Sequence, residues 1–177
     1  ADAIDHADFL TGGFPAGYSG RLSSIPDIGL RTGATHLRAS SHVSLLSSKV
    51  YVEGPLPFGS SFLISGRRTY MDQVVAALTS YTLPYYFSDL LGKLSVPTGD
   101  GSVSVTGYWG RDAFKLNLVP ADTLRDAVDL AWKWGNRFAV ANWSQPVGFA
   151  EGHVEARAGV SDYFGIIGLP PNLVSWG

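Results

Sequence analysis

Residues 102–110 read Ser102-Val103-Ser104-Val105-Thr106-Gly107-Tyr108-Trp109-Gly110, so that hydroxyl-bearing side chains alternate with apolar or small ones almost throughout. Successive side chains of a β-strand point to opposite faces, whereas those of an α-helix repeat with a longer period. This alternation therefore predicts a β-strand with one small, apolar face and one polar face.

A second stretch with the same period lies near the end of the chain, at residues 153–163. Valine and alanine occupy every second position from 154 to 160, and mostly polar or charged residues lie between them. The side-chain period fixes which residues share a face of a sheet. We therefore predict a single sheet with one side carrying Val103, Val105, Trp109, Val154, Ala156 and Val160, and the other carrying Ser104, Thr106, Glu155 and Arg157.

The connections between the expected strands alternate between short and long from about residue 48 onward. Short connections carry turn residues, as in Pro97-Thr98-Gly99-Asp100-Gly101. This alternation predicts an up-and-down meander of sequential antiparallel strands, with the short turns at one end. The short connections are 54–60, 97–101 and 147–152, and the long ones are 71–84 and 115–130, with short helices expected at 72–80 and 120–128. The expected strands are 4–10, 21–30, 35–43, 47–54, 61–70, 86–96, 102–116, 131–144 and 153–167.

The composition suits a sheet that faces lipid on one side. Of 177 residues, 45% are hydrophobic, 12% are aromatic and only 16% are charged, whereas about a quarter is usually charged in a soluble domain. Alternating runs close to the roughly 9–11 residues of a tilted membrane strand are typical of outer-membrane β-barrels, as are short turns at one end. A carbohydrate-binding β-sandwich has a similar composition, and its strands alternate too.

Few residues suggest chemistry. The absence of cysteine excludes disulfides and thiolate ligands, and a net charge of −2 gives no basic footprint for nucleic acid. The glycine-rich loop at 11–20 lacks a phosphate-binding motif, and the four histidines lack the spacing of a metal site. The pairs Asp5/Asp8 and Glu151/Glu155 are interpreted as solvated charges rather than as a glycosidase pair. We therefore expect no enzymatic activity, no cofactor and no metal.

The first seventy residues carry longer motifs. Asp8-Phe9-Leu10, Gly12-Gly13-Phe14-Pro15-Ala16, Tyr18 and Gly20-Arg21-Leu22-Ser23-Ser24 together resemble the end of the plug domain of TonB-dependent outer-membrane receptors. Two further stretches resemble the first barrel hairpin of that family and its periplasmic turn: Leu45-Leu46-Ser47-Ser48-Lys49 and Val52-Glu53-Gly54-Pro55-Leu56. The next strand of a Bacteroidetes-like branch of the family is resembled by Ser61-Phe62-Leu63-Ile64-Ser65-Gly66-Arg67-Arg68-Thr69-Tyr70. A less specific resemblance extends to Gly107-Tyr108-Trp109-Gly110-Arg111-Asp112 and Trp134-Gly135-Asn136.

The resemblance implies that residues 1–33 are the C-terminal end of a plug and residues 34–177 are about seven strands of a 22-stranded barrel. The expected fold class is all-β: an antiparallel up-and-down meander forming part of a transmembrane β-barrel, with a short plug-derived N-terminal segment. The family takes up scarce ligands across the bacterial outer membrane with energy relayed by TonB. The implied partners are therefore outer-membrane lipid, TonB and a small ligand of unknown identity.

Two consecutive arginines give the sharpest structural expectation. Arg67 and Arg68 must face opposite sides of their strand. Arg68 shares the parity of the apolar residues before it, and an arginine facing lipid costs least near the membrane interface. We therefore expect Arg68 at the outer rim. Arg67 is expected to face inward, at a plug–barrel interface that also includes Arg21, Asp8 and Asp27, with the two aspartates as its first candidate partners.

The aromatic residues allow two interpretations. An aromatic girdle at the membrane interface is favoured, with Tyr70, Trp109, Trp132 and Trp134 as its members. The alternative is a sugar-binding platform formed by Trp109, Trp132, Trp134 and Trp143.

Two alternatives for the whole chain also stay open. One is a complete small barrel of about eight strands with a structural or adhesive role in the outer membrane. The other is a secreted carbohydrate-binding β-sandwich.

Overall fold

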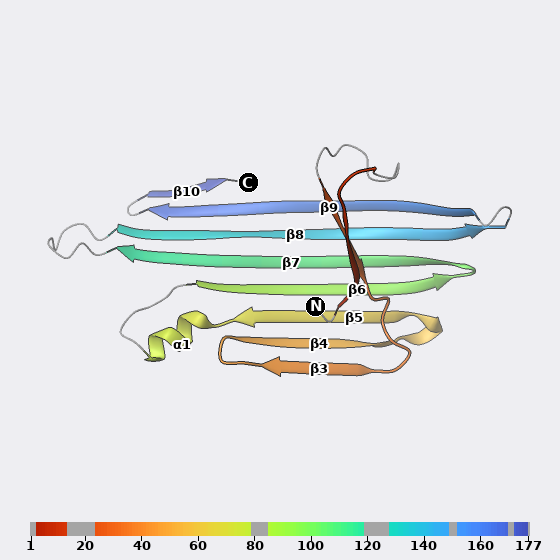
Figure 1. Ribbon diagram of the computed structural model, residues 1–177, viewed down its shortest axis with the longest axis horizontal. Coiled ribbons are helices and arrows are strands. Elements are labelled where there is room, and N and C mark those ends of the chain that lie inside the picture. Colours follow the sequence, from red (N-terminus) through yellow and green to blue (C-terminus); the bar gives the residue numbers. More distant parts are fainter. Residues whose placement is uncertain are drawn as a thin grey trace.

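The computed structural model describes residues 3–13, 24–78, 85–118, 128–148, 152–169 and 172–176. Over these ranges the protein is all-β and folds as an antiparallel up-and-down meander, as the alternation predicted (Figure 1). The strands form a two-stranded ribbon, β1–β2, and one eight-stranded sheet in the order β10-β9-β8-β7-β6-β5-β4-β3. The described sheet is open, with β3 and β10 as its edges.

The ribbon consists of β1 (Ile4–Leu10) and β2 (Ile25–Leu30). The sheet consists of β3 (Arg38–Val43), β4 (Ser47–Pro55), β5 (Ser61–Thr69), β6 (Tyr85–Thr98), β7 (Gly101–Leu118), β8 (Val128–Val147), β9 (Gly152–Leu169) and β10 (Asn172–Trp176). A 3-10 turn, η2 (Pro57–Gly59), follows β4, and a helix, α1 (Met71–Leu78), follows β5. No helix in the described ranges is long and apolar enough to cross a membrane.

The three expected short turns lie at one end of the sheet, because every strand from β3 to β10 pairs antiparallel with its sequence neighbour. This end is called the short-turn end, and the opposite end, where α1 lies, β7 ends and β8 begins, is called the long-loop end. Two short turns contain positive φ values, at Gly99 (φ 63°) in one and at Phe58 (φ 61°) and Gly59 (φ 73°) in the other, and glycine adopts this conformation without steric cost. The long-loop end also holds one tight link, Ser44–Leu46, between β3 and β4.

The strand boundaries differ from expectation mainly in length. The expected long connection 115–130 is shorter, because β7 continues to Leu118 and β8 begins at Val128. The expected helix at 120–128 falls almost wholly outside the described residues, and its last residue, Val128, is in β8. The helix expected at 72–80 forms as α1, and β10 was not expected.

The two faces of the sheet separate as predicted. Unbroken register joins Val103 to Trp143 and Trp143 to Ala156, so that these side chains share one face. Ser104, Asn142 and Arg157 share the other by the same rule. The first is called the apolar face. It carries Val103, Val105, Trp109, Val154, Ala156 and Val160, whereas Ser104, Thr106, Glu155 and Arg157 lie on the opposite face.

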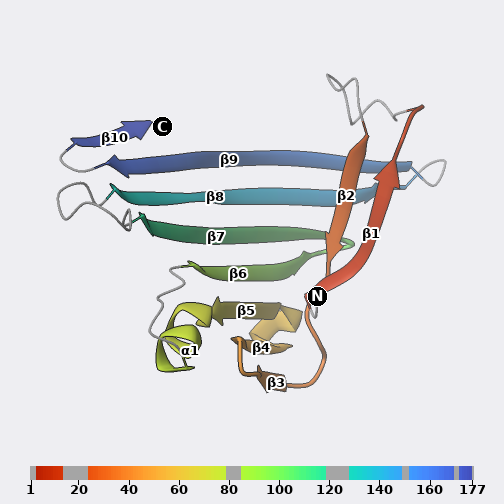
Figure 2. The same cartoon turned by 60° about the vertical axis from the view of Figure 1, so that its left-hand side comes forward.

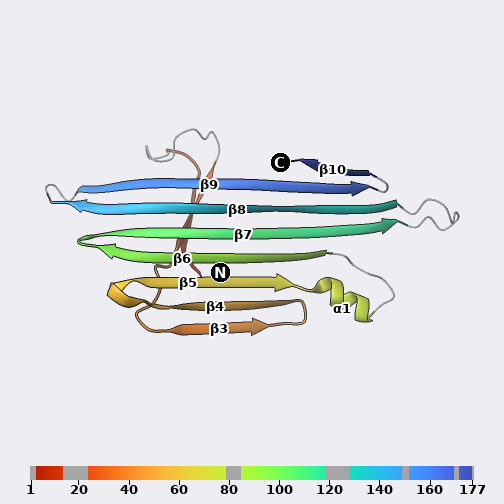
Figure 3. The same ribbon diagram turned by 180° about the vertical axis from the view of Figure 1, so that it is seen from behind.

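The β1–β2 ribbon lies on that opposite face, which is called the ribbon face. The ribbon crosses the long strands rather than following them. It lies in front of the sheet in Figure 1 and behind the sheet, partly covered, in Figure 3, and Figure 2 shows it standing off one side of the sheet. The Lys93 Nζ donates to the Leu30 carbonyl oxygen at 2.8 Å, and the Ser61 hydroxyl donates to the Thr32 carbonyl oxygen. Both donors lie on the ribbon face of the sheet.

The core is small and lies between the ribbon and the sheet. Leu63 is fully buried and packs with Ala3 and Tyr51, and Leu30 and Leu91 adjoin this cluster. The apolar face has no such cover in the described chain. Its large side chains are exposed, with Val160 at 73%, Leu90 at 51%, Val105 at 47% and Trp109 and Trp143 at 40% each. Buried apolar area is therefore concentrated on the polar side of the sheet.

Candidate functional site

The long-loop half of the ribbon face gathers aromatic side chains from four neighbouring strands. Trp132 and Trp134 have ring centroids 5.2 Å apart, and Tyr108 stacks on Phe138 at 5.3 Å with an interplanar angle of 20°. Tyr163 remains 67% exposed. We call this set the aromatic surface; the strand pairings place on it Tyr85, Phe87, Tyr108, Phe114, Trp132, Trp134, Phe138 and Tyr163.

Charged groups lie among these rings. Arg67 binds a single oxygen of Asp89, through Nε at 2.9 Å and Nη2 at 2.8 Å, and its guanidinium lies 4.6 Å from the Phe87 ring centroid. The Tyr85 hydroxyl donates to Asp112 Oδ1 at 3.5 Å. An arginine held on one side by a carboxylate and on the other by a ring is fixed in orientation. These groups therefore present a defined polar pattern within an apolar surface.

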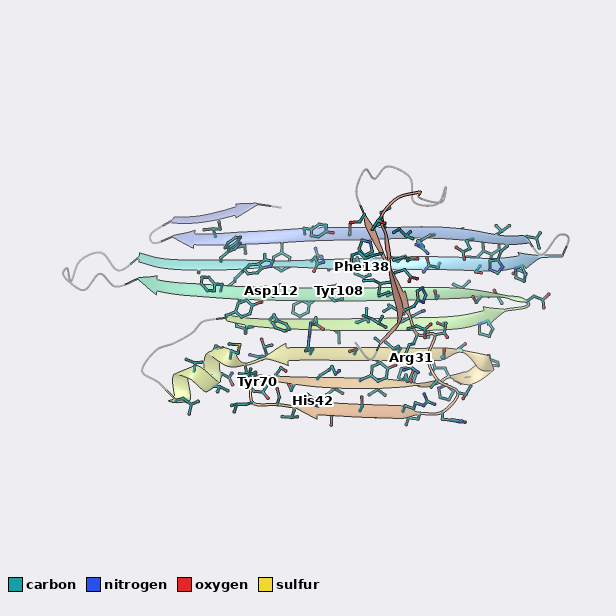
Figure 4. All side chains as sticks on the ribbon, viewed as in Figure 1. Arg31, His42, Tyr70, Tyr108, Asp112 and Phe138 are labelled. Atoms are coloured by element: carbon teal, nitrogen blue, oxygen red, sulfur yellow. The ribbon has the colours of Figure 1, made fainter. Side chains whose placement is uncertain are left out.

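A cavity of about 530 Å³ opens where the ribbon meets this surface. Ala3, Ile28 and Leu30 line it from the ribbon side. The sheet contributes Leu91, Tyr108, Phe138, Arg67 and Asp89. Figure 4 shows Tyr108 and Phe138 close to the crossing ribbon, and Asp112 further toward the long-loop end. The size and mixed lining fit a small-molecule site.

The two arginines lie on the faces that the parity rule predicted. Arg68 shares the apolar face with Phe62 and Ile64, and its guanidinium lies 5.7 Å from the Tyr86 ring centroid at the long-loop end. Arg67 lies on the ribbon face, but its partner is Asp89.

The expected partners of Arg67 need correction. Asp89 is directly opposite Arg67 on the neighbouring strand, and this cross-strand contact replaces the expected one with Asp8 or Asp27. Those two aspartates face each other across the ribbon, at paired positions of β1 and β2. The remaining member of the expected interface, Arg21, lies outside the described residues.

The expected girdle residues do not share one face. Trp109 lies on the apolar face, but Trp132 and Trp134 pair with Phe114 and Asp112 on the ribbon face. Tyr70 follows the end of β5, and its hydroxyl donates to the Ser44 carbonyl oxygen, which ties the strand to the β3–β4 link. A second apolar-face tryptophan, Trp143, was not assigned to the girdle by sequence reasoning, although it occupies the same alternating set as Ala139 and Ala141.

The apolar face is divided into two zones along the strands. The rows of paired residues that contain Gly101, Val103, Val105 and Gly107 carry no charged side chain in the described sheet. Trp143 lies within this uncharged zone, in the row of Val103. Trp109 lies in the row that follows the zone toward the long-loop end. From Gly101 to Trp109 the strand rises roughly 27 Å, or roughly 21 Å across a membrane at the usual tilt. This span approaches the apolar band of about 25 Å in outer-membrane barrels.

Within the described ranges no group of three or more His, Asp or Glu residues lies close enough to hold a metal ion. Comparisons with protein-family models, curated proteins and solved structures found no match to this chain.

The Arg67–Asp89 pair yields a direct test. Arg67→Ala is expected to destabilise the protein by about 1–3 kcal/mol, because it leaves a mostly buried carboxylate without its cation; the Asp89 side chain is only 18% exposed. Arg68→Ala removes an exposed guanidinium and is expected to change stability by about 0.5 kcal/mol or less. Urea unfolding in detergent measures both. Equal losses, or a larger loss from Arg68→Ala, would show that the two faces are wrongly assigned.

Proposed function

We propose that this chain is a segment of a TonB-dependent receptor of the bacterial outer membrane, comprising the end of the plug and part of the barrel wall. In this proposal the apolar face contacts lipid and the ribbon face lines the lumen. The β1–β2 ribbon is the end of the plug. The receptor binds a scarce ligand and imports it with energy from TonB, without chemical change to the ligand.

One observation carries the proposal. A single sheet has one face that is exposed and free of charge over four rows, while the chain's own ribbon packs on the other face. Soluble proteins bury the apolar face of a sheet and leave the polar face in water. The reverse arrangement suits a barrel wall, which is apolar toward lipid and polar toward the lumen.

The two alternatives fit the described structure less well. A β-sandwich requires a second sheet over the apolar face, and the ribbon packs on the opposite side. A complete small barrel requires its first and last strands to pair, whereas β3 and β10 each pair with one neighbour in the described sheet. Unpaired strand edges are costly in lipid, and further wall strands would satisfy them.

The aromatic surface has a natural role within this proposal. It lies on the lumenal face toward the long-loop end, which is the outer end in this orientation. Rings with fixed polar groups between them, and the adjoining cavity, would contact the ligand. The sugar-platform interpretation of Trp132 and Trp134 is compatible with this position, whereas Trp109 and Trp143 lie on the other face.

Membrane insertion tests the proposal. The natural full-length gene product, folded in the presence of dimyristoyl phosphatidylcholine vesicles, is expected to float with them on a density gradient and to resist extraction at alkaline pH. A tryptophan-free soluble protein of similar size, processed in parallel, controls for trapping. Recovery of the folded protein in the soluble fraction would reject the outer-membrane proposal and favour the β-sandwich.

A further inference from the structure

We propose that the apolar face carries a binding site for the phosphate groups of an anionic lipid headgroup at the long-loop end of the sheet. This inference rests on the proposed contact of that face with lipid, and it adds a specific lipid partner. The site is called the cationic patch; it consists of Arg68, Arg111, Lys133 and Arg137, with Asp162 as its one carboxylate.

The patch is defined by where charge is placed. Among the residues whose side chains the structure describes, every charged side chain of the apolar face belongs to it, and all five occupy the three rows that contain Trp109, Arg111 and Ala113. Four are cations and one is an anion, so the patch has a net charge of +3. Immediately toward the short turns, the rows from Gly107 to Gly101 are uncharged. The positive groups therefore lie together at one boundary of the apolar zone.

Three of the cations surround a single point of the sheet. Gly135 lies directly opposite Arg111 and between Lys133 and Arg137 along β8. Diagonal neighbours on paired strands lie about 7–8 Å apart, within reach of long side chains. The Phe164 ring covers Gly135, since a Cβ there would meet it at 2.6 Å. The positions of Arg111, Lys133 and Arg137 therefore surround the Phe164 ring.

The carboxylate present neutralises only one of these cations. Arg137 donates to Asp162 Oδ2 from Nη2 at 2.6 Å and from Nε at 2.8 Å. In the described structure the Nε of Arg111 is buried without a hydrogen-bond partner. Like charges at this spacing repel unless an anion lies between them. No carboxylate of the described residues pairs with Arg111, so its positive charge is available to an external anion.

The position identifies the source of the anion. The patch adjoins an apolar zone that lipid tails would cover, so the headgroups of the same lipids would lie at its level. Phosphate accepts hydrogen bonds from arginine in a bidentate manner. Trp109 and Tyr86 lie on the same face at this level, as aromatic residues do at membrane interfaces. A lipid with several phosphates, such as lipid A, matches the charge of the patch best.

Lipid A binding to the full-length gene product in detergent tests the inference, measured as the rise in melting temperature across a lipid A titration. The double variant Arg111→Gln/Lys133→Gln is expected to bind lipid A about thirtyfold more weakly, because each basic residue at an anionic surface contributes about a fivefold factor. The control Arg157→Gln removes one charge from an exposed ribbon-face residue and is expected to bind within about twofold of the unmodified protein. Neutral phosphatidylcholine is expected to give no such difference between variants.

Three results would overturn the inference. They are equal lipid A affinity in the unmodified protein and the double variant, an equal loss in Arg157→Gln, and full displacement of lipid A by millimolar inorganic phosphate, which would indicate a free-anion site. A failure of the proposed lipid A site can be distinguished from a failure of the proposed function. A protein that inserts into phosphatidylcholine vesicles without preferring lipid A retains its membrane assignment and loses only the lipid site.

Discussion

Leu63→Ala is expected to lower the free energy of unfolding by about 2–5 kcal/mol, the usual cost of truncating a buried leucine. Leu63 is 0% exposed, and it packs against Ala3 of the N-terminal segment and Tyr51 of the neighbouring strand. Truncation leaves a cavity between ribbon and sheet, where neighbouring side chains are held by backbone pairing on both sides. Urea unfolding of the full-length gene product in detergent measures the loss.

The adjacent residue supplies the control. Ile64 lies on the apolar face and is 49% exposed. Ile64→Ala removes a side chain of equal size where lipid or detergent can refill the space, so we expect a loss of about 1 kcal/mol or less. Equal losses at the two positions would mean that the ribbon does not form a packed core with the sheet.

The strands were predictable from sequence because their side-chain period is a local property. Residues 102–110 and 153–163 alternate clearly, and the turn at 97–101 carries the residues that a tight reversal needs. The length of β7 and β8 was not predictable in the same way. These strands extend because each residue from Ser102 to Leu118 finds a partner on β8, which is a property of the pair.

The site was less predictable, because it depends on register between strands. Both faces of β8 carry apolar side chains: Trp132, Trp134 and Phe138 lie on the ribbon face, and Ala139, Ala141 and Trp143 lie on the apolar face. Sequence alone therefore does not show that Trp132 and Trp109 lie on opposite faces. The pairing of Arg67 with Asp89 depends likewise on the register of β5 and β6, which are separated by a long connection.

The central claim is that the apolar face contacts lipid, and two adjacent residues of β9 test it most directly. Val160 lies in the row of Gly107, the last uncharged row before the row of Trp109, and is 73% exposed; Ser161 is an exposed residue of the ribbon face. The measurement is the free energy of unfolding of Val160→Arg and Ser161→Arg, made in the full-length gene product folded into phosphatidylcholine vesicles.

A lipid-facing Val160 predicts a loss of about 2 kcal/mol for Val160→Arg, which lies between the costs of arginine at the bilayer midplane and at the interface, and a change of about 0.5 kcal/mol or less for Ser161→Arg. If both faces contact water, arginine is solvated at either exposed position. Changes of about 0.5 kcal/mol or less in both variants would therefore contradict the account.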